Sequence, residues 1–405
     1  MSLRRAFSLL LMGCMLFSIF ALASCEKKGA TETTATGTEP VGTEPEATGA
    51  NTTEAETTAA TTERPAPEPN VYYSFQNNQE YIKLLGRSRY YRSAVVLDWT
   101  AAGLEFEFEG SGDLKMNVEF SGGRSATLTV EVDGTARDVA VEGSGTIRIA
   151  SGLADGVHHV RVRRRTRVAN DTKGLLLMAQ GVTMTGYFLE RPADNTYKVA
   201  FLGDSITCGE GLTGTNGLLT YAVDLCTREG FDYDICAVSG IGVCRTYKKD
   251  GYSENTMTKF YPFFNYFRSE TLRYLPDRRA DLVIVNLNTN DSILTTATDD
   301  AEYKGALKTL ITEIRDAHGT DVPILWIVGM MISPNAQVNR WLNDVFAELG
   351  GESAGLYQIT VETNTSGDQN HPNQDSHLAV SQALSAYIRA KNLLDLSPLT
   401  TPSAE

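Results

Sequence analysis

The sequence predicts a two-domain protein, in which a β-sandwich precedes an α/β domain built on a parallel sheet. The first observation is a series of short strands with alternating apolar and polar residues, separated by glycine turns, over residues 71–193. The second is a set of almost wholly apolar strands that alternate with helical stretches over residues 194–397. The segment before residue 71 has neither pattern.

The N-terminus has the features of a targeting segment. Two arginines precede an apolar run over residues 6–23, and the small residues Ala23 and Ser24 lead to Cys25. This pattern predicts a secretory signal peptide over residues 1–25. The cysteine at its end resembles a bacterial lipobox, which implies that Cys25 is diacylated and anchors an extracytoplasmic protein to the cell membrane. An ordinary signal peptide or a single membrane helix is the alternative.

Residues 26–70 are dominated by Thr, Glu, Ala, Gly and Pro. Such a composition buries too little apolar surface to offset the entropy of ordering, so we expect an extended tether. The segment holds nine Glu residues and contributes to a net charge of -14. An acidic chain releases no counterions from a polyphosphate, which argues against nucleic acid as a partner.

Between residues 71 and 193, runs of period-two alternation predict the strands of the β-sandwich. They cover residues 104–108, 114–120, 126–132, 145–150 and 158–165. The last of these runs is rich in arginine, at positions Arg161, Arg163, Arg164, Arg165 and Arg167. A solvated face that blocks edge-to-edge aggregation is the favoured interpretation. Recognition of an anionic glycan is the alternative.

From residue 194 onwards, apolar strands are expected at residues 197–202, 234–238, 281–287 and 323–328. Helical patterns lie at residues 221–229 and 378–390. This alternation predicts a parallel sheet with helices on both faces. Loops at the carboxyl ends of its strands should therefore hold the functional groups.

The candidate nucleophile follows the first of these strands, in the turn Gly203-Asp204-Ser205. A serine at a strand-to-helix turn exposes its hydroxyl and directs its own N–H to the same place, which suits covalent acyl transfer. The chain has no G-x-S-x-G elbow, and a helix N-cap is the alternative role for this serine.

The serine needs a base, and His371 is the best placed of the five histidines. It lies in a loop before the terminal helix, whereas His377 should begin that helix. Asp368, three residues earlier, can fold back and bond the second ring nitrogen of His371. The sequence thus predicts Ser205, His371 and Asp368 as a catalytic triad.

Two further strand ends offer donors for an oxyanion. Gly240 follows the second strand and, without a side chain, can bring its N–H close to a ligand. Asn290 follows the third strand and carries an amide donor. With the N–H of Ser205, these groups form the predicted oxyanion hole.

Four cysteines remain in the folded part, and their spacing matches no zinc pattern. Buried free thiols are favoured over disulfides. They are Cys208, Cys226, Cys236 and Cys244.

Taken together, the strand-end residues resemble the four signatures of the SGNH (GDSL-like) hydrolases. The longer strings Gly-Asp-Ser-Ile-Thr-Cys-Gly and Val-Ser-Gly-Ile-Gly-Val are similar to carbohydrate esterase family 2. The resemblance implies a flavodoxin-like three-layer domain behind a jelly roll, and acetyl-ester hydrolysis on acetylated polysaccharide without metal or cofactor. One departure is Asn288, where the family usually has Gly. A side chain there could narrow the acyl pocket or shift Asn290. Some members use a main-chain carbonyl in place of the acid.

Three alternatives stay open. One is a lipase-like or thioesterase-like enzyme acting on longer acyl chains. Another is a surface glycan-binding lipoprotein without activity. The third is a role for Trp326 and Tyr247 in stacking on sugar rings of the substrate, although packing within the fold is the favoured role for both side chains.

Overall fold

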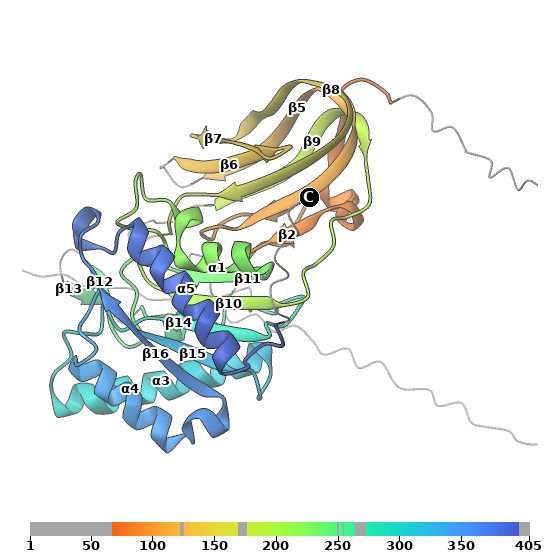
Figure 1. Ribbon diagram of the computed structural model, residues 1–405. Coiled ribbons are helices and arrows are strands. Elements are labelled where there is room, and N and C mark those ends of the chain that lie inside the picture. The colour runs from red at the N-terminus through yellow and green to blue at the C-terminus, as the bar shows by residue number, and fades with distance from the viewer. Residues whose placement is uncertain are drawn as a thin grey trace, which may run out of the picture. The chain divides into compact units, whose positions relative to one another are not determined.

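The computed structural model describes residues 67–121, 125–168, 176–248, 251–253, 255–263 and 273–396. All of them belong to the unit Arg64–Glu405, in which an antiparallel sheet precedes a parallel one (Figure 1). The predicted signal peptide, Cys25 and all but the last four residues of the predicted tether lie outside the described residues. Within the described part, no helix is long and apolar enough to cross a membrane.

The N-terminal domain is antiparallel, as predicted, and hydrogen bonds join its described strands into one nine-stranded sheet. These strands are β1 (Val71–Ser74), β2 (Lys83–Leu85), β3 (Arg89–Tyr91), β4 (Ala94–Val96), β5 (Gly103–Ser121), β6 (Ala126–Val132), β7 (Thr135–Val141), β8 (Gly145–Arg164) and β9 (Leu176–Phe188). The alternating apolar residues face one core, in which Leu104, Phe106 and Phe108 are fully buried.

Two pairs of predicted strands are in fact single long strands. The runs at 104–108 and 114–120 are both part of β5, and those at 145–150 and 158–165 are both part of β8. Register shifts at Gly110 and Gly112 mark irregularities where an antiparallel pair can bend without ending. The glycines of β5 therefore mark a bend within one strand, whereas the sequence analysis expected a turn between two strands.

The C-terminal domain has a five-stranded parallel sheet in the described residues, in the order β11-β10-β14-β15-β16. Its strands are β10 (Lys198–Gly203), β11 (Asp232–Ala237), β14 (Leu282–Asn286), β15 (Ile324–Met330) and β16 (Leu356–Thr363). In chain order this is 2-1-3-4-5, the flavodoxin-like arrangement. The hairpin β12 (Thr246–Lys248) and β13 (Gly251–Ser253) and the short α2 (Met257–Phe260) follow β11.

Helices cover both faces of this sheet (Figure 1). Helices α1 (Tyr221–Glu229) and α5 (Gln374–Ala390) pack on one face. Helices α3 (Ala297–His318) and α4 (Gln337–Glu348) pack on the other. The sequence analysis did not predict α4 or β16. β16 mixes buried and exposed positions, so it lacks the apolar run that marked the other four.

The two domains are joined through buried arginine. Arg87, two residues after β2, is fully buried and lies 3.5 Å over the ring of Tyr274. Its Nη2 donates to the main-chain carbonyls of Tyr261 and Phe263 at 2.9 Å each, and Nη1 lies 3.7 Å from Asp234 in β11. Because a buried guanidinium is costly unless these groups surround it, Arg87 fixes where the N-terminal domain docks.

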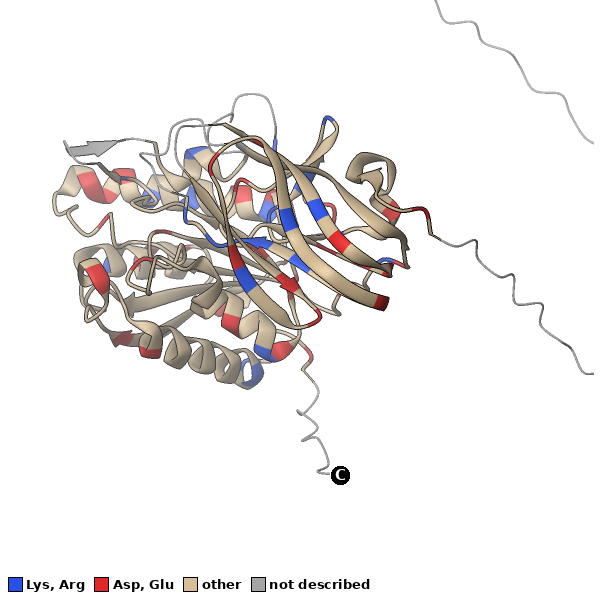
Figure 2. Ribbon diagram, turned by 90° about the horizontal axis from the view of Figure 1, so that it is seen from above, with Lys and Arg blue, Asp and Glu red and all other residues tan. Residues whose placement is uncertain are grey.

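The solvated face predicted for the arginines of β8 is wrong. Figure 2 shows acidic and basic residues interleaved on neighbouring strands of the antiparallel sheet. Arg161 Nη2 lies 3.0 Å from Glu105, and both Arg161 and Arg163 lie 3.5 Å from Glu131. Arg164 points the other way, is fully buried, and donates to the carbonyls of residues 97 and 98. Strand periodicity correctly put Arg161 and Arg163 on one face of β8 and Arg164 on the other. The face of Arg161 and Arg163 is not open to solvent, however, because the second domain and side chains of neighbouring strands cover it.

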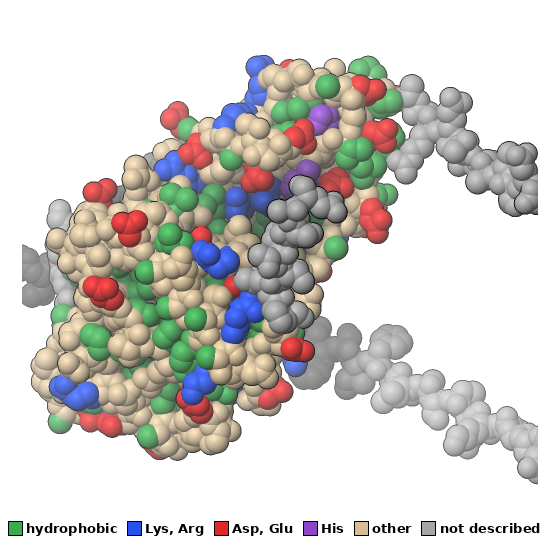
Figure 3. Space-filling view, in the orientation of Figure 1, with side chains coloured by type: hydrophobic (Ala, Val, Ile, Leu, Met, Phe, Trp, Pro, Cys, Tyr) green, Lys and Arg blue, Asp and Glu red, His purple; other side chains and the backbone are tan. Residues whose placement is uncertain are grey.

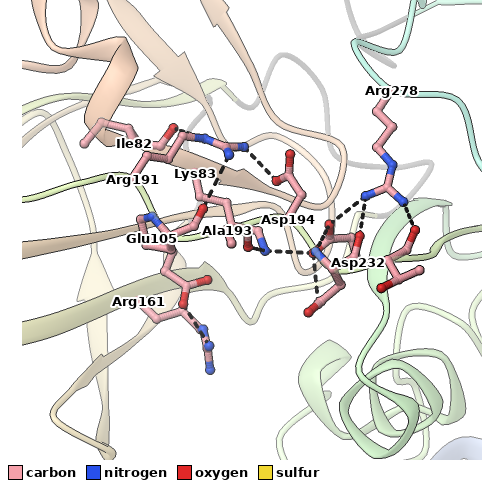
Figure 4. Close-up of polar contacts among 12 residues, drawn as sticks. Ile82, Lys83, Glu105, Arg161, Arg191, Ala193, Asp194, Asp232 and Arg278 are labelled. Atoms are coloured by element: carbon pink, nitrogen blue, oxygen red, sulfur yellow. Dashed lines mark hydrogen bonds and ion pairs between the residues drawn. The ribbon is translucent and has the colours of Figure 1, made fainter. Parts of the chain in front are cut away.

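A cavity of about 1080 Å³ lies beside these arginines, between the domains. It opens at the amino ends of the parallel strands, near the start of β10 and β11. Figure 4 shows its charges paired with one another: Lys83 Nζ lies 2.9 Å from Asp232, and Arg278 Nη1 3.2 Å from the same carboxylate. Basic side chains gather on the face seen in Figure 3, where the two domains meet. The cavity is thus lined by paired charges and lies at the amino-terminal edge of the parallel sheet, opposite the edge that holds Ser205.

Candidate active site

The candidate nucleophile lies where the order of the parallel sheet reverses. β10 ends at Gly203, with β11 on one side and β14 on the other. Loops that leave neighbouring strands in opposite directions open a crevice at this point. Ser205 follows β10 by two residues, and Asn290 follows β14 by four. The chain therefore brings these side chains to one edge of the sheet.

Ser205 and His371 are in direct contact. The Oγ of Ser205 and the Nε2 of His371 are 2.8 Å apart, although 166 residues separate them in the sequence. Ser205 is 6% exposed and His371 is partly exposed. A serine hydroxyl hydrogen-bonded to an imidazole nitrogen can lose its proton to that nitrogen as it attacks a carbonyl.

The second nitrogen of His371 does not meet the predicted acid. Its Nδ1 lies 3.0 Å from the main-chain carbonyl oxygen of Gln369, and the exposed Asp368 side chain makes no hydrogen bond among the described residues. The prediction of Asp368 as the triad acid is therefore wrong in this structure. Residues 368–370 form a single 3-10 turn in which Gln369 has φ 54°, and this turns its carbonyl towards the imidazole. A carbonyl accepts from Nδ1–H and so fixes the tautomer that leaves Nε2 as the base.

Close backbone packing holds His371 in place. Gly211 has φ +85°, and a Cβ built on it would lie 2.6 Å from the Cβ of His371 and 2.7 Å from the carbonyl oxygen of Pro372. From the other side, the N–H of Gly367 donates to the carbonyl of His371 at 2.8 Å. The loop that follows the nucleophile and the loop that carries the base thus touch without room for a methyl group.

The predicted oxyanion donors surround the same turn. Within the described residues, the N–H groups of Ser205 and Gly240 have no hydrogen-bond acceptor, so both are available to a ligand. Gly240 has φ +87°, a backbone conformation that favours glycine. Asn290 Nδ2 donates to the carbonyl of Ile241 at 2.8 Å and lies 3.5 Å from Asp204 Oδ2. One hydrogen of that amide is thereby committed, and the long second contact leaves the other weakly held.

Two buried carboxyl groups hold these loops. Asp291 accepts the N–H groups of Val243, Cys244 and Arg245 at 2.8 Å each, and so ties the loop after β11 to the loop after β14. Burial raises the pKa of Asp291 to about 6 and that of Asp204 to about 7. Asp204 Oδ1 also accepts the N–H of Ile206 at 3.0 Å, which closes the turn around Ser205.

Comparison with known proteins agrees with this geometry. The sequence profile of the GDSL-like Lipase/Acylhydrolase family matches residues 201–379, and that of the Carbohydrate esterase 2 N-terminal domain matches residues 84–180. The chain joins a carbohydrate esterase 2 N-terminal domain to a GDSL-like acylhydrolase domain. The Cellulase/esterase CelE of Acetivibrio thermocellus is 27% identical over 321 residues, which are 72% of this chain and 37% of that protein. The chain therefore spans little more than a third of that relative.

Solved structures share the arrangement of both domains. An acetyl xylan esterase from the rumen bacterium Butyrivibrio proteoclasticus aligns with a TM-score of 0.70 and 20% identity, over 80% of this chain and 99% of that one. A family two carbohydrate esterase from Clostridium thermocellum, in complex with cellohexaose, aligns with a TM-score of 0.67 and 24% identity, over 77% of this chain and 100% of that one. At these identities the likeness establishes the fold.

The GDSL-like domain departs from the family pattern at Asn288, and the structure explains how it tolerates the change. Asn288 has φ +89°, which glycine adopts readily and asparagine better than most residues. Its side chain is buried, donates to Asn339 Oδ1 at 2.9 Å and accepts from the Tyr303 hydroxyl at 2.6 Å. Residues of α3 and α4 thus bond both ends of the Asn288 amide.

The remaining side chains that the sequence analysis considered in the GDSL-like domain are buried, except for Tyr247. His377 is fully buried in the first turn of α5, where its Nδ1 accepts the N–H of Tyr221 at 3.1 Å. Trp326 is fully buried, as expected of a packing residue, whereas Tyr247 is 53% exposed in the hairpin next to Gly240. The four cysteines are free and buried, as predicted.

Sequence reasoning missed several residues that shape the site. The carbonyl of Gln369 carries no sequence signal, because every residue has one. Gly211 could have been flagged as a glycine near the nucleophile, and Asp291 as the acid after Asn290. Glu210 and Arg167, which form an ion pair, come from different domains and could not have been paired from spacing. The described residues contain no group of three or more His, Cys, Asp or Glu side chains that could hold a metal ion.

Proposed function

We propose that this protein is a serine esterase that removes acetyl groups from polysaccharide through an acyl-enzyme. The observation that carries the proposal is the 2.8 Å contact between Ser205 Oγ and His371 Nε2. The GDSL-like domain is a carboxylic ester hydrolase by its family, and its relatives include an acetyl xylan esterase and a Cellulase/esterase.

The reaction follows from the groups at the edge of the sheet. His371 takes the proton of Ser205 as its Oγ attacks the ester carbonyl carbon. The N–H groups of Ser205 and Gly240 and the weakly held second amide hydrogen of Asn290 hold the negative tetrahedral oxygen. His371 returns the proton to the departing sugar hydroxyl, and water then attacks the acetyl-serine by the same route and releases acetate.

Polysaccharide as the substrate rests on the N-terminal domain and on the exposed surface near the site. The N-terminal domain matches carbohydrate esterase 2, and we infer for it the jelly-roll connectivity typical of that family. Tyr247 presents half of its surface beside the Gly240 loop, and its N–H donates to the Gly240 carbonyl at 2.8 Å. An exposed aromatic ring at this place can stack on a sugar ring of the substrate.

The decisive experiment compares two serine variants. Ser205→Ala should abolish turnover of 4-nitrophenyl acetate and leave the thermal unfolding curve unchanged. Ser381→Ala removes a buried hydroxyl on α5 that bonds Asp224 and neither Ser205 nor His371, and should keep the wild-type rate. Retained turnover in Ser205→Ala would remove the mechanism. Acetate release from acetylated xylan, mannan and peptidoglycan, and rates on acetyl and octanoyl esters, then define the substrate.

We also propose that the protein is anchored outside the cytoplasm by lipid on Cys25, from the apolar run and small residues that precede it. Mass spectrometry of the N-terminal peptide from the native host should find a diacylated cysteine. Cys25→Ser should release the protein from the membrane fraction. An unmodified Cys25 would contradict the anchor and leave the esterase proposal untouched.

A further inference from the structure

The segment that leaves β8 crosses from the N-terminal domain onto the nucleophile loop of the GDSL-like domain. The carbonyl of Arg165 accepts the N–H of Gly217 at 3.1 Å. The carbonyl of Val168 accepts the N–H of Ser239 at 2.8 Å and lies 3.5 Å from the thiol of Cys208. Residues 165–168 are therefore in direct contact with two of the three loops that supply the proposed oxyanion donors, those of Ser205 and Gly240.

The side chain of Arg167 reaches further into the same place. Its Nη1 makes an ion pair with Glu210 Oε1 and donates to Ser239 Oγ at 3.1 Å. The Ser239 hydroxyl in turn donates to Glu210 Oε1 at 2.9 Å. Glu210 belongs to the nucleophile turn, since its N–H donates to the carbonyl of Ser205 at 3.0 Å. We call Arg167, Glu210 and Ser239 the interdomain clamp.

The clamp acts on the residue directly before Gly240. Ser239 is held at its N–H by Val168 and at its hydroxyl by Arg167 and Glu210. The N–H of Gly240 belongs to the peptide group that begins at Ser239, so holding Ser239 fixes the direction of that N–H. On the far side, the Gly240 carbonyl is held by the N–H of Tyr247. The clamp therefore orients a donor whose N–H has no acceptor among the described residues.

The charge of Glu210 gives the clamp a second effect. The Glu210 side chain is 3% exposed, and its Oε2 is buried without a hydrogen-bond partner in the described structure. A carboxylate buried one turn from Ser205 would oppose the negative charge that develops on the tetrahedral intermediate. Arg167, whose side chain is 34% exposed, neutralises it from the N-terminal domain.

We propose that Arg167 is a positioning residue, by which the N-terminal domain orients the Gly240 N–H and neutralises Glu210 beside the nucleophile. The inference rests on the proposed function and deepens it, because it makes the N-terminal domain a part of the catalytic site. A domain that served only to bind glycan would have no such contact with the oxyanion loop.

The test uses Arg167→Ala, Arg167→Lys and a matched control, Arg165→Ala. Arg165 is two residues away and also bridges the domains, through Asp138 and the carbonyl of Thr213, but it contacts neither Glu210 nor Ser239. Loss of one oxyanion donor costs about 10²–10³ in rate, so a misoriented donor should lower kcat by about 10–100-fold. KM for 4-nitrophenyl acetate should stay within about twofold, because the effect is confined to the transition state. Arg167→Lys should recover part of the loss, and Arg165→Ala should match wild type.

Hydrogen exchange provides a second readout that needs no activity. In Arg167→Ala, peptides that cover residues 238–247 should exchange faster than in wild type, and in Arg165→Ala they should not. A kcat in Arg167→Ala within about twofold of wild type, or an equal loss in both variants, would overturn the inference while the esterase stands. A wild-type protein without esterase activity would overturn the proposed function. In that case the exchange measurement still tests the interdomain clamp, and unchanged exchange in Arg167→Ala would overturn it.

Discussion

Replacing Gly211 by alanine should disable the proposed base although neither reacting residue is substituted. The new Cβ would lie 2.6 Å from the Cβ of His371, where carbon atoms normally approach to about 3.5–4.0 Å. One of the two loops must therefore move by about 1 Å. Such a shift lengthens the 2.8 Å contact between Ser205 Oγ and His371 Nε2 beyond a good hydrogen bond. A misplacement of about 1 Å at a catalytic group can cost about 10²-fold in rate.

Gly230→Ala is a matched control for this change. Gly230 also has a left-handed backbone, with φ +67°, but a Cβ built on it meets nothing within 4 Å. Both variants should lose about 1–2 kcal/mol of stability, because an L-residue is strained in that conformation. Gly211→Ala should lose a further 1–3 kcal/mol or so from the close contact.

The assay is the steady-state rate on 4-nitrophenyl acetate, with urea unfolding measured in parallel. We expect kcat to fall by about 10²-fold in Gly211→Ala and to stay near the wild-type value in Gly230→Ala. If kcat in the two variants agrees within about threefold, the close packing of the two loops does not position His371, and the reasoning fails.

Three further predictions concern other side chains of the GDSL-like domain. Asp368→Asn should keep kcat within about threefold of wild type, since Gln369 faces the imidazole, and a loss of about two orders of magnitude would restore Asp368 as the acid. Burial lowers the pKa of His377 from 6.5 to about 4, so the unfolded chain takes up a proton between these values that the folded chain does not, and stability falls as the pH drops from 6.5 to 4. His377→Gln should show a smaller fall in urea-unfolding free energy between pH 7 and pH 4.5 than wild type, and an equal fall would contradict this. The four buried thiols, Cys208, Cys226, Cys236 and Cys244, should resist a thiol reagent until urea unfolds the protein. Burial raises their pKa values, and thiolate is the reactive form. Labelling of the folded protein would contradict this prediction.

The placement of the site could be predicted because it depends on local patterns. Apolar runs specify the parallel strands, and the residues directly after each run must lie in a loop at the carboxyl edge of the sheet. Ser205, Gly240 and Asn290 were found in this way, and His371 by the loop before the last helix. Helix α4 was missed although Val338, Trp341, Leu342 and Val345 form a buried stripe at helical spacing, so the signal was present in the sequence.

The sequence by itself determined the alternation of strands and helices, the order of the site residues along the chain, and the face on which each strand residue lies. Only the tertiary structure decided which group contacts each of them. It gave His371 the carbonyl of Gln369 in place of Asp368, and it directed Arg167 to Glu210 and Ser239 in the other domain. The reason is physical: periodicity comes from the backbone geometry of one segment, whereas a partner is set by which segments pack together, and here main-chain carbonyls and a second domain supply partners that no spacing encodes.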